Sequence, residues 1–214
     1  YQRALPYLET YFEQSPQRIT RDDQYQMGFA YYSAGRYSKS INHFDKVISG
    51  SDAMAQNAHY HLADAYLKTD QKRFARNPFM AAFQNKHDDA IAEDALFNYA
   101  KLSYELAIDP YNEAILSFQR YIEEYPRSER IEEAYRYLVD IYLTTHNYRD
   151  AMASIEKIQI NAPRLRSAFQ RIAYYRGVEL FNNGDFGYWL VTVERPLKCT
   201  LANWTGVAYK IPRT

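Results

Sequence analysis

The sequence predicts an all-α protein in which antiparallel pairs of helices repeat along the chain. Apolar residues recur at the 3.6-residue period of a helix in ten segments. A motif of small and aromatic residues returns at intervals of about 35 residues, the mark of a repeat architecture. The chain also has 22 tyrosines but only 7 glycines, which favours packed helices with large rings over a turn-rich β protein.

The composition narrows the classes of partner. The chain carries 26 basic and 26 acidic residues, so its net charge attracts neither nucleic acid nor an anionic membrane surface. No apolar run approaches the roughly 20 residues that cross a bilayer. We therefore expect no nucleic acid partner and no membrane span. A single cysteine, Cys199, excludes an internal disulfide and a multi-cysteine metal site.

The hydrophobic period places the elements in chain order. The expected helices cover 3–14, 22–34, 38–49, 53–68, 72–85, 90–106, 111–124, 129–144, 148–160 and 165–182. The first of them reads as the second half of a repeat unit. The chain opens inside this helix and shows no secretory signal, so the cytoplasm and the periplasm or cell envelope both remain open as its compartment.

Small residues mark where the two helices of each unit approach one another. One group lies in the first helix of each unit: Gly28, Ala63, Ala100, Val139 and Gly177. Another group opens the second helix: Ala4, Ser40, Ala75, Ala114 and Ala151. An aromatic residue follows the first group three positions later in Tyr31, Tyr66 and Tyr142, and is expected to fill the space between units. Pro16, Pro126 and Pro163 end units, because proline cannot continue a helix.

This pattern resembles the tetratricopeptide repeat family over residues 1–186, as about five units of which the first and last are partial. The resemblance implies a right-handed superhelix, an α-solenoid stabilised by contacts between neighbouring units. The periods of about 35–39 residues are longer than the usual 34. With the stretch FQRYIEEYPRSERIEEAYRYLVDIY at 118–142, they look most like the repeat domains of bacterial cell-envelope proteins.

Residues 187–214 break the pattern. This stretch contains β-branched residues, Pro196 and both tryptophans, and predicts short strands or an irregular tail. Its part KCTLANWTGVAYKIPRT resembles the opening segment of GIY-YIG nuclease-family proteins, but stops before the GIY and YIG motifs. No catalytic residue can be carried over. A fusion or frameshift scar and a native cap both remain open for this tail.

The chain shows no pattern of catalytic or metal-binding residues. It lacks a GxSxG turn, a P-loop and an HExxH helix. His61 and Asp64 lie on one helix face, but a metal site needs more ligands than this pair supplies. We therefore expect a protein that is not an enzyme and that uses no cofactor and no metal ion.

The resemblance implies a binding face on the first helix of each unit. Carried over position by position, it contains Tyr25, Phe29, Tyr60, Asp64, Phe97, Lys101, Arg136, Asp140 and Tyr174. A ladder of rings with polar neighbours suits an extended or helical peptide, although the same rings could instead pack between helices. We predict a protein–protein interaction scaffold. The alternative is a structural part of a cell-envelope assembly, or a fragment of a longer repeat protein without its own ligand. A dimer through the C-terminal unit is also left open.

Overall fold

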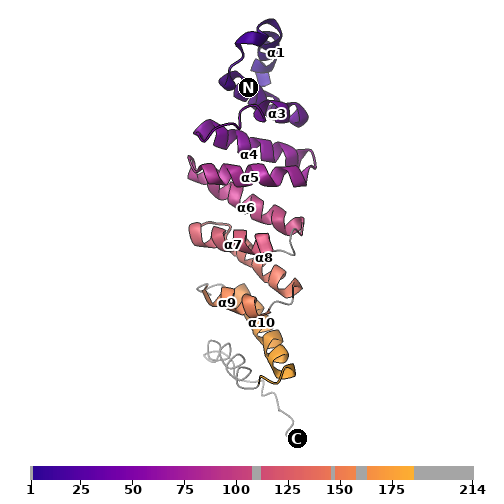
Figure 1. Ribbon diagram of the computed structural model, residues 1–214, viewed down its shortest axis with the longest axis vertical. Coiled ribbons are helices and arrows are strands. Elements are labelled where there is room, and N and C mark those ends of the chain that lie inside the picture. Colours follow the sequence, from indigo (N-terminus) through magenta and orange to yellow (C-terminus); the bar gives the residue numbers. More distant parts are fainter. Residues whose placement is uncertain (1, 108–111, 146–147, 158–162, 186–214) are drawn as a thin grey trace. The chain divides into compact units, whose positions relative to one another are not determined.

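The structure is a computed structural model that describes residues 2–107, 112–145, 148–157 and 163–185 (Figure 1). Every regular element in these residues is helical, so the predicted all-α class is confirmed there. Two short 3-10 helices cover Gln2–Ala4 and Pro16–Arg18. The α-helices are α1 (Leu5–Gln14), α2 (Arg21–Ser33), α3 (Tyr37–Phe44), α4 (Ala53–Lys68), α5 (Lys72–Asn85), α6 (Asp89–Glu105), α7 (Asn112–Glu124), α8 (Ile131–Thr144), α9 (Tyr148–Lys157) and α10 (Pro163–Asn182).

The chain divides into two compact bodies. The N-terminal body is Tyr1–Tyr137 and the C-terminal body is Leu138–Thr214. In the N-terminal body, α2 packs on α3, α4 on α5 and α6 on α7, so the predicted helix pairs are confirmed. In the C-terminal body, α9 packs on α10. The predicted boundary between repeats and tail at residue 186 stays a prediction, and the strands expected in 187–214 lie outside the described residues.

Tight turns reverse the chain between the two helices of a pair. Gly35 follows α2 with φ +71°, and Asp70 follows α4 with φ +60°. In both turns, the next residue donates its N–H to a carbonyl five residues earlier, from Arg36 to Tyr31 and from Gln71 to Tyr66. A left-handed residue at this point satisfies helix carbonyls that would otherwise lack partners. The chain therefore reverses direction at each turn and runs back along the preceding helix.

The expected helix 38–49 is wrong at its C-terminal end, because α3 ends at Phe44. The chain then turns, and the N–H of Val47 bonds the carbonyl of Phe44 at 2.8 Å. The Val47 carbonyl accepts from Nε of Arg21 at 2.9 Å. The two nitrogens at the end of the Arg21 side chain also bond Asp52, whose side chain caps α4 by accepting from Ala55 N. Arg21 on α2 thus binds both the turn that follows α3 and the residue that caps α4.

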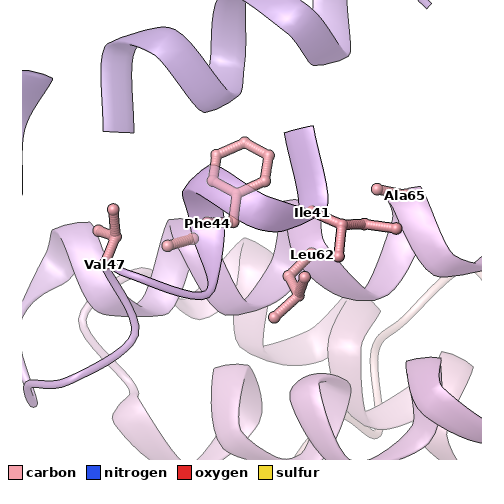
Figure 2. Close-up of a cluster of buried hydrophobic side chains, with 6 residues drawn as sticks. Ile41, Phe44, Val47, Leu62 and Ala65 are labelled. Atoms are coloured by element: carbon pink, nitrogen blue, oxygen red, sulfur yellow. The ribbon is translucent and has the colours of Figure 1, made fainter. Parts of the chain in front are cut away.

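Apolar side chains fill the space between consecutive pairs. One cluster joins α3 to α4 (Figure 2). Its buried members are Ile41, Phe44, Val47, Ala58, Leu62 and Ala65. A second cluster joins α1 to α2 through Leu5, Met27, Ala30 and Tyr31. The core is therefore a series of interfaces between neighbouring helices, which is how repeat proteins gain stability.

Gly28 marks the closest approach of α2 and α3. A Cβ atom on Gly28 would lie 3.0 Å from two ring carbons of Phe44 and 3.3 Å from Cβ of His43. Phe44 is fully buried, so its ring has little room to move. The small residue predicted at this position is therefore a steric requirement of the pair.

We expect Gly28→Leu to lower the free energy of unfolding by about 1–3 kcal/mol, because it overpacks the contact with Phe44. Chemical denaturation followed by circular dichroism measures this change. The matched control is Gln26→Leu, which adds a leucine at an exposed position of the same helix. Equal stability of the two variants would show that α2 and α3 do not pack as described.

His43 gives the same region a dependence on pH. Its ring lies between Phe12 and Tyr31, and Nδ1 is 2.8 Å from Oε1 of Gln24. Burial first, and then the charges of Lys46 and Lys39, lower the pKa of His43 to about 4. As the pH falls below about 6.5, the unfolded chain therefore takes up a proton before the folded chain does.

We expect the His43 contribution to stability to be complete above about pH 6.5 and to be lost as the pH falls towards 4. Denaturation curves at pH 7.5 and pH 5 measure this loss, and His43→Gln should reduce the difference between the two curves. An unchanged difference in this variant would assign the acid sensitivity to other groups.

Candidate protein-binding face

The candidate site lies on the first helices of the pairs in the N-terminal body. α2 contacts α4, and α4 contacts α6, so these helices form a continuous row. We call the side chains of Tyr25, Phe29, Tyr32, Tyr60, His61, Asp64, Asp94 and Lys101 the helix-A face. The same helices also carry fully buried alanines such as Ala63 and Ala100.

Rings form an unbroken strip from α2 to α4. Tyr25 stacks on Phe29 with ring centroids 6.3 Å apart, and Phe29 meets the edge of His61 at 5.1 Å. His61 in turn contacts Tyr60 at 5.6 Å. All four side chains are half-buried. The strip therefore combines apolar area with fixed geometry, the two properties that aromatic contact surfaces provide.

His61 is the centre of this strip and was not among the predicted site residues. Its ring also lies 4.9 Å from Tyr32 and 5.9 Å from Phe44. Burial lowers the pKa of His61, which keeps the imidazole neutral among these rings, although Asp64 opposes the shift. His61 therefore has a packing role among these rings.

Tyrosine hydroxyls link each first helix to the next. The hydroxyl of Tyr32 on α2 donates to Oδ2 of Asp64 on α4 at 2.6 Å. The hydroxyl of Tyr60 on α4 donates to Oδ2 of Asp94 on α6 at 2.5 Å. Burial first, and then the bond to the carboxylate, raise the pKa of both phenols. Both hydroxyls therefore remain protonated donors at neutral pH.

Asp94 gathers three donors. It accepts from the Tyr60 hydroxyl, from Nδ2 of Asn98 at 2.8 Å and from Nη1 of Arg130. Arg130 also lies over the ring of Phe97, 5.1 Å from its centroid. The carboxylate is thereby paired with donors from the protein itself. It serves the stacking of the helices and is not left as an open negative charge.

Phe97 packs inside the N-terminal body. Its side chain is 4% exposed, and its ring contacts Phe118 and Tyr121 on α7 and Tyr137 on α8. The neighbouring helices and Arg130 cover it, so a partner does not reach this ring. The sequence left two roles open for Phe97, contact with a partner and packing between helices. The residues around its ring match the packing role.

The remaining predicted residues divide between the bodies. In the N-terminal body, Lys101 is half-buried on α6, and the Arg136 side chain is 62% exposed, 3.7 Å from Glu133. In the C-terminal body, Asp140 is exposed on α8 and Tyr174 is 66% exposed on α10. The structure therefore brings Tyr25, Phe29 and Tyr60 into one strip, with Asp64 beside it.

A polar hollow of about 510 Å³ lies elsewhere on the N-terminal body. Its lining is Lys86, Asp89, Ala90, Glu93, Glu124 and Tyr125. Glu124 is already paired with Lys86 and Arg120, and Glu93 accepts from the hydroxyl of Tyr121. Among the described residues, no three His, Cys, Asp or Glu side chains come together in a way that could hold a metal ion.

Residues 94–128 match the family model of the tetratricopeptide repeat. They contain most of α6, the whole of α7 and the connection between them. The chain contains a tetratricopeptide repeat. The resemblance that the sequence predicts is thus confirmed, and repeats of this family are in general scaffolds for protein–protein interaction.

Solved structures of tetratricopeptide type are similar to this chain. A tetratricopeptide repeat protein from Parabacteroides merdae is 19% identical, with 92% of this chain and 71% of that chain covered and a TM-score of 0.44. Two structures of nearly identical TPR-like repeats from Podosopora anserina are each 11% identical. They cover 84% and 86% of this chain and 93% and 97% of theirs, with TM-scores of 0.45 and 0.44. None of the curated proteins matches this chain in sequence.

No helix in the described part of the chain is both long and apolar enough to cross a membrane.

We expect Tyr60→Phe to lower the free energy of unfolding by about 1–3 kcal/mol, because it leaves Asp94 with one donor fewer. A double-mutant cycle with Asp94→Ala isolates the link, because alanine has no acceptor for the Tyr60 hydroxyl and the cycle subtracts what each side chain contributes elsewhere. The control is Tyr7→Phe, which removes a hydroxyl from a side chain that is 80% exposed. A coupling energy near zero would contradict a link between α4 and α6.

Proposed function

We propose that the N-terminal body binds a segment of a partner protein, extended or helical, on the helix-A face. The observation that carries this proposal is the strip of half-buried rings Tyr25, Phe29, His61 and Tyr60. Rings offer contact area at a small cost in side-chain entropy, and a strip that is already packed needs little reordering when a ligand binds.

The charges near the strip suggest what the partner carries. Asp64 and Asp94 are occupied by tyrosine hydroxyls, and Asp94 also by Arg130. Lys101 is half-buried on the helix-A face, whereas Arg136 lies outside this face on α8 and is paired with Glu133. The helix-A face therefore offers rings and the cation of Lys101, and we propose that it prefers a segment with apolar or aromatic side chains next to an acidic group.

We further propose that the protein performs no bond chemistry. The carboxylates of the helix-A face are held by hydrogen bonds that link helices, and His61 is enclosed by rings. Such groups stabilise the stack. A catalytic acid or base needs instead to reach a substrate proton.

A displayed peptide library, selected for binding to the parent chain, supplies the ligands that test the proposal. The dissociation constant of each selected peptide is measured by fluorescence anisotropy with the parent chain and with Tyr25→Ala/Lys101→Ala. We expect binding to the double variant to be at least about tenfold weaker, which corresponds to roughly 1.4 kcal/mol. Phe97 is left intact, because its replacement would open the core.

The matched control is Arg73→Ala/Phe74→Ala, which removes a cation and an exposed ring from α5. It should bind the peptides as tightly as the parent chain, and circular dichroism should show the same helix content in all three proteins. Equal weakening in both double variants, or in neither, would move the binding surface away from the helix-A face.

A further inference from the structure

The rings around His61 leave one of its two nitrogens open. His61 stacks on the fully buried Phe44 and contacts Phe29, Tyr32 and Tyr60. Within the described part of the chain, its Nδ1 is buried and has no hydrogen-bond partner. Its Nε2 has no partner there either, but this atom is not buried. Nε2 is therefore a polar atom of the ring strip that solvent reaches and that no described residue binds.

The buried nitrogen decides where the proton of the imidazole sits. Burial lowers the pKa of His61, so the ring is neutral at pH 7 and carries a proton on only one nitrogen. A proton on Nδ1 would make a buried N–H donor without an acceptor, and such orphaned donors are rare in folded proteins. A proton on Nε2 is instead hydrated. The burial of Nδ1 therefore favours the tautomer with the proton on Nε2.

We propose that the Nε2–H of His61 donates a hydrogen bond to a backbone carbonyl of the bound segment. This inference rests on the proposed function of the helix-A face. A segment that covers the ring strip removes water from Nε2, and a buried donor without an acceptor costs free energy. The segment must therefore replace the lost water with an acceptor at this point.

The polar groups next to His61 are engaged with one another. The hydroxyl of Tyr32 donates to Asp64 at 2.6 Å, and that of Tyr60 donates to Asp94 at 2.5 Å. The acceptor for Nε2 consequently comes from the partner. Side chains that suit a strip of rings are apolar or aromatic, so the acceptor that the segment brings is a carbonyl of its backbone.

A backbone acceptor also limits the conformation of the segment. Inside an α-helix each carbonyl accepts from the N–H four residues later, and only the last four carbonyls lack such a partner. An extended segment offers its main-chain groups along its whole length. Of the two conformations that the proposed function allows, the His61 contact therefore selects the extended one.

The tautomer is tested on the full chain without a ligand. Isotope labelling of the histidine nitrogens, with their correlation to the ring protons in NMR spectra, shows which nitrogen carries the proton. His61→Phe assigns the signals of this ring by their loss. We expect the proton on Nε2 at pH 7.5, and a proton on Nδ1 would overturn the proposal.

The contact is tested with peptides selected from a displayed library for binding to the parent chain. His61→Phe keeps a ring in the strip but removes the donor, so we expect it to weaken binding at least about threefold in fluorescence anisotropy. The matched control is His59→Phe, the same exchange on a different side of α4, which should bind as tightly as the parent. Circular dichroism checks that both variants fold. Equal affinity of His61→Phe and the parent, or equal weakening in both variants, would contradict the contact.

A scan of peptide esters identifies the acceptor. Replacing one amide of the peptide by an ester makes the carbonyl of that bond a weaker acceptor. At one position, the ester should weaken binding to the parent at least about threefold more than binding to His61→Phe, which has no donor to lose. The comparison subtracts the effect of the amide N–H that the ester also removes. If no position behaves in this way, the acceptor is not a backbone carbonyl and the proposal is wrong.

The results also separate this proposal from the proposed function. If Tyr25→Ala/Lys101→Ala weakens binding and His61→Phe does not, the helix-A face binds the segment and the His61 contact is wrong. If neither variant weakens binding, the proposed function fails together with the contact that rests on it. The far-UV circular dichroism of the complex should equal the sum of its free components, and a gain of helix would show a helical segment and overturn the His61 contact.

Discussion

The close approach of paired helices is the constraint on which the other contacts depend. A side chain at Gly28 would meet the ring of Phe44 at 3.0 Å, and Ala63 and Ala100 hold the equivalent positions in the next pairs. Small residues let the two helices of a pair pack closely together. Consecutive first helices are also in direct contact. Only then can a hydroxyl on α4 reach a carboxylate on α6. The helix-A face is therefore a consequence of small residues that lie behind it.

The tyrosine–aspartate hydrogen bonds connect neighbouring first helices at defined positions. A half-buried carboxylate without partners would be costly, whereas Asp94 receives Tyr60, Asn98 and Arg130. Burial and the hydrogen bond raise the pKa of Tyr60 as well as that of Tyr32, so neither donor is lost near neutral pH. Apolar packing alone tolerates sliding between helices. These directed bonds do not, and we infer that they fix the order of the rings on the face.

Sequence periodicity predicts the helices well, because each buries one stripe against its neighbours. It misplaces the end of α3, since that end depends on Arg21 binding the Val47 carbonyl 26 residues away. It also does not reveal the links from Tyr32 to Asp64 and from Tyr60 to Asp94. A search for donor–acceptor pairs about one repeat apart could have found these links, because both span nearly the length of a repeat.

One repeat position shows why a site cannot be read from register alone. Tyr25, Tyr60, Phe97 and Tyr174 are equivalent, yet the first two are half-buried, the third is enclosed and the fourth is largely exposed. Phe97 differs from Tyr60 because Tyr137 and Arg130 lie against its ring. The exposure of a ring is thus set by the helix that follows it. In the N-terminal body, the rings at this repeat position therefore stay partly exposed on α2 and α4 and are enclosed on α6.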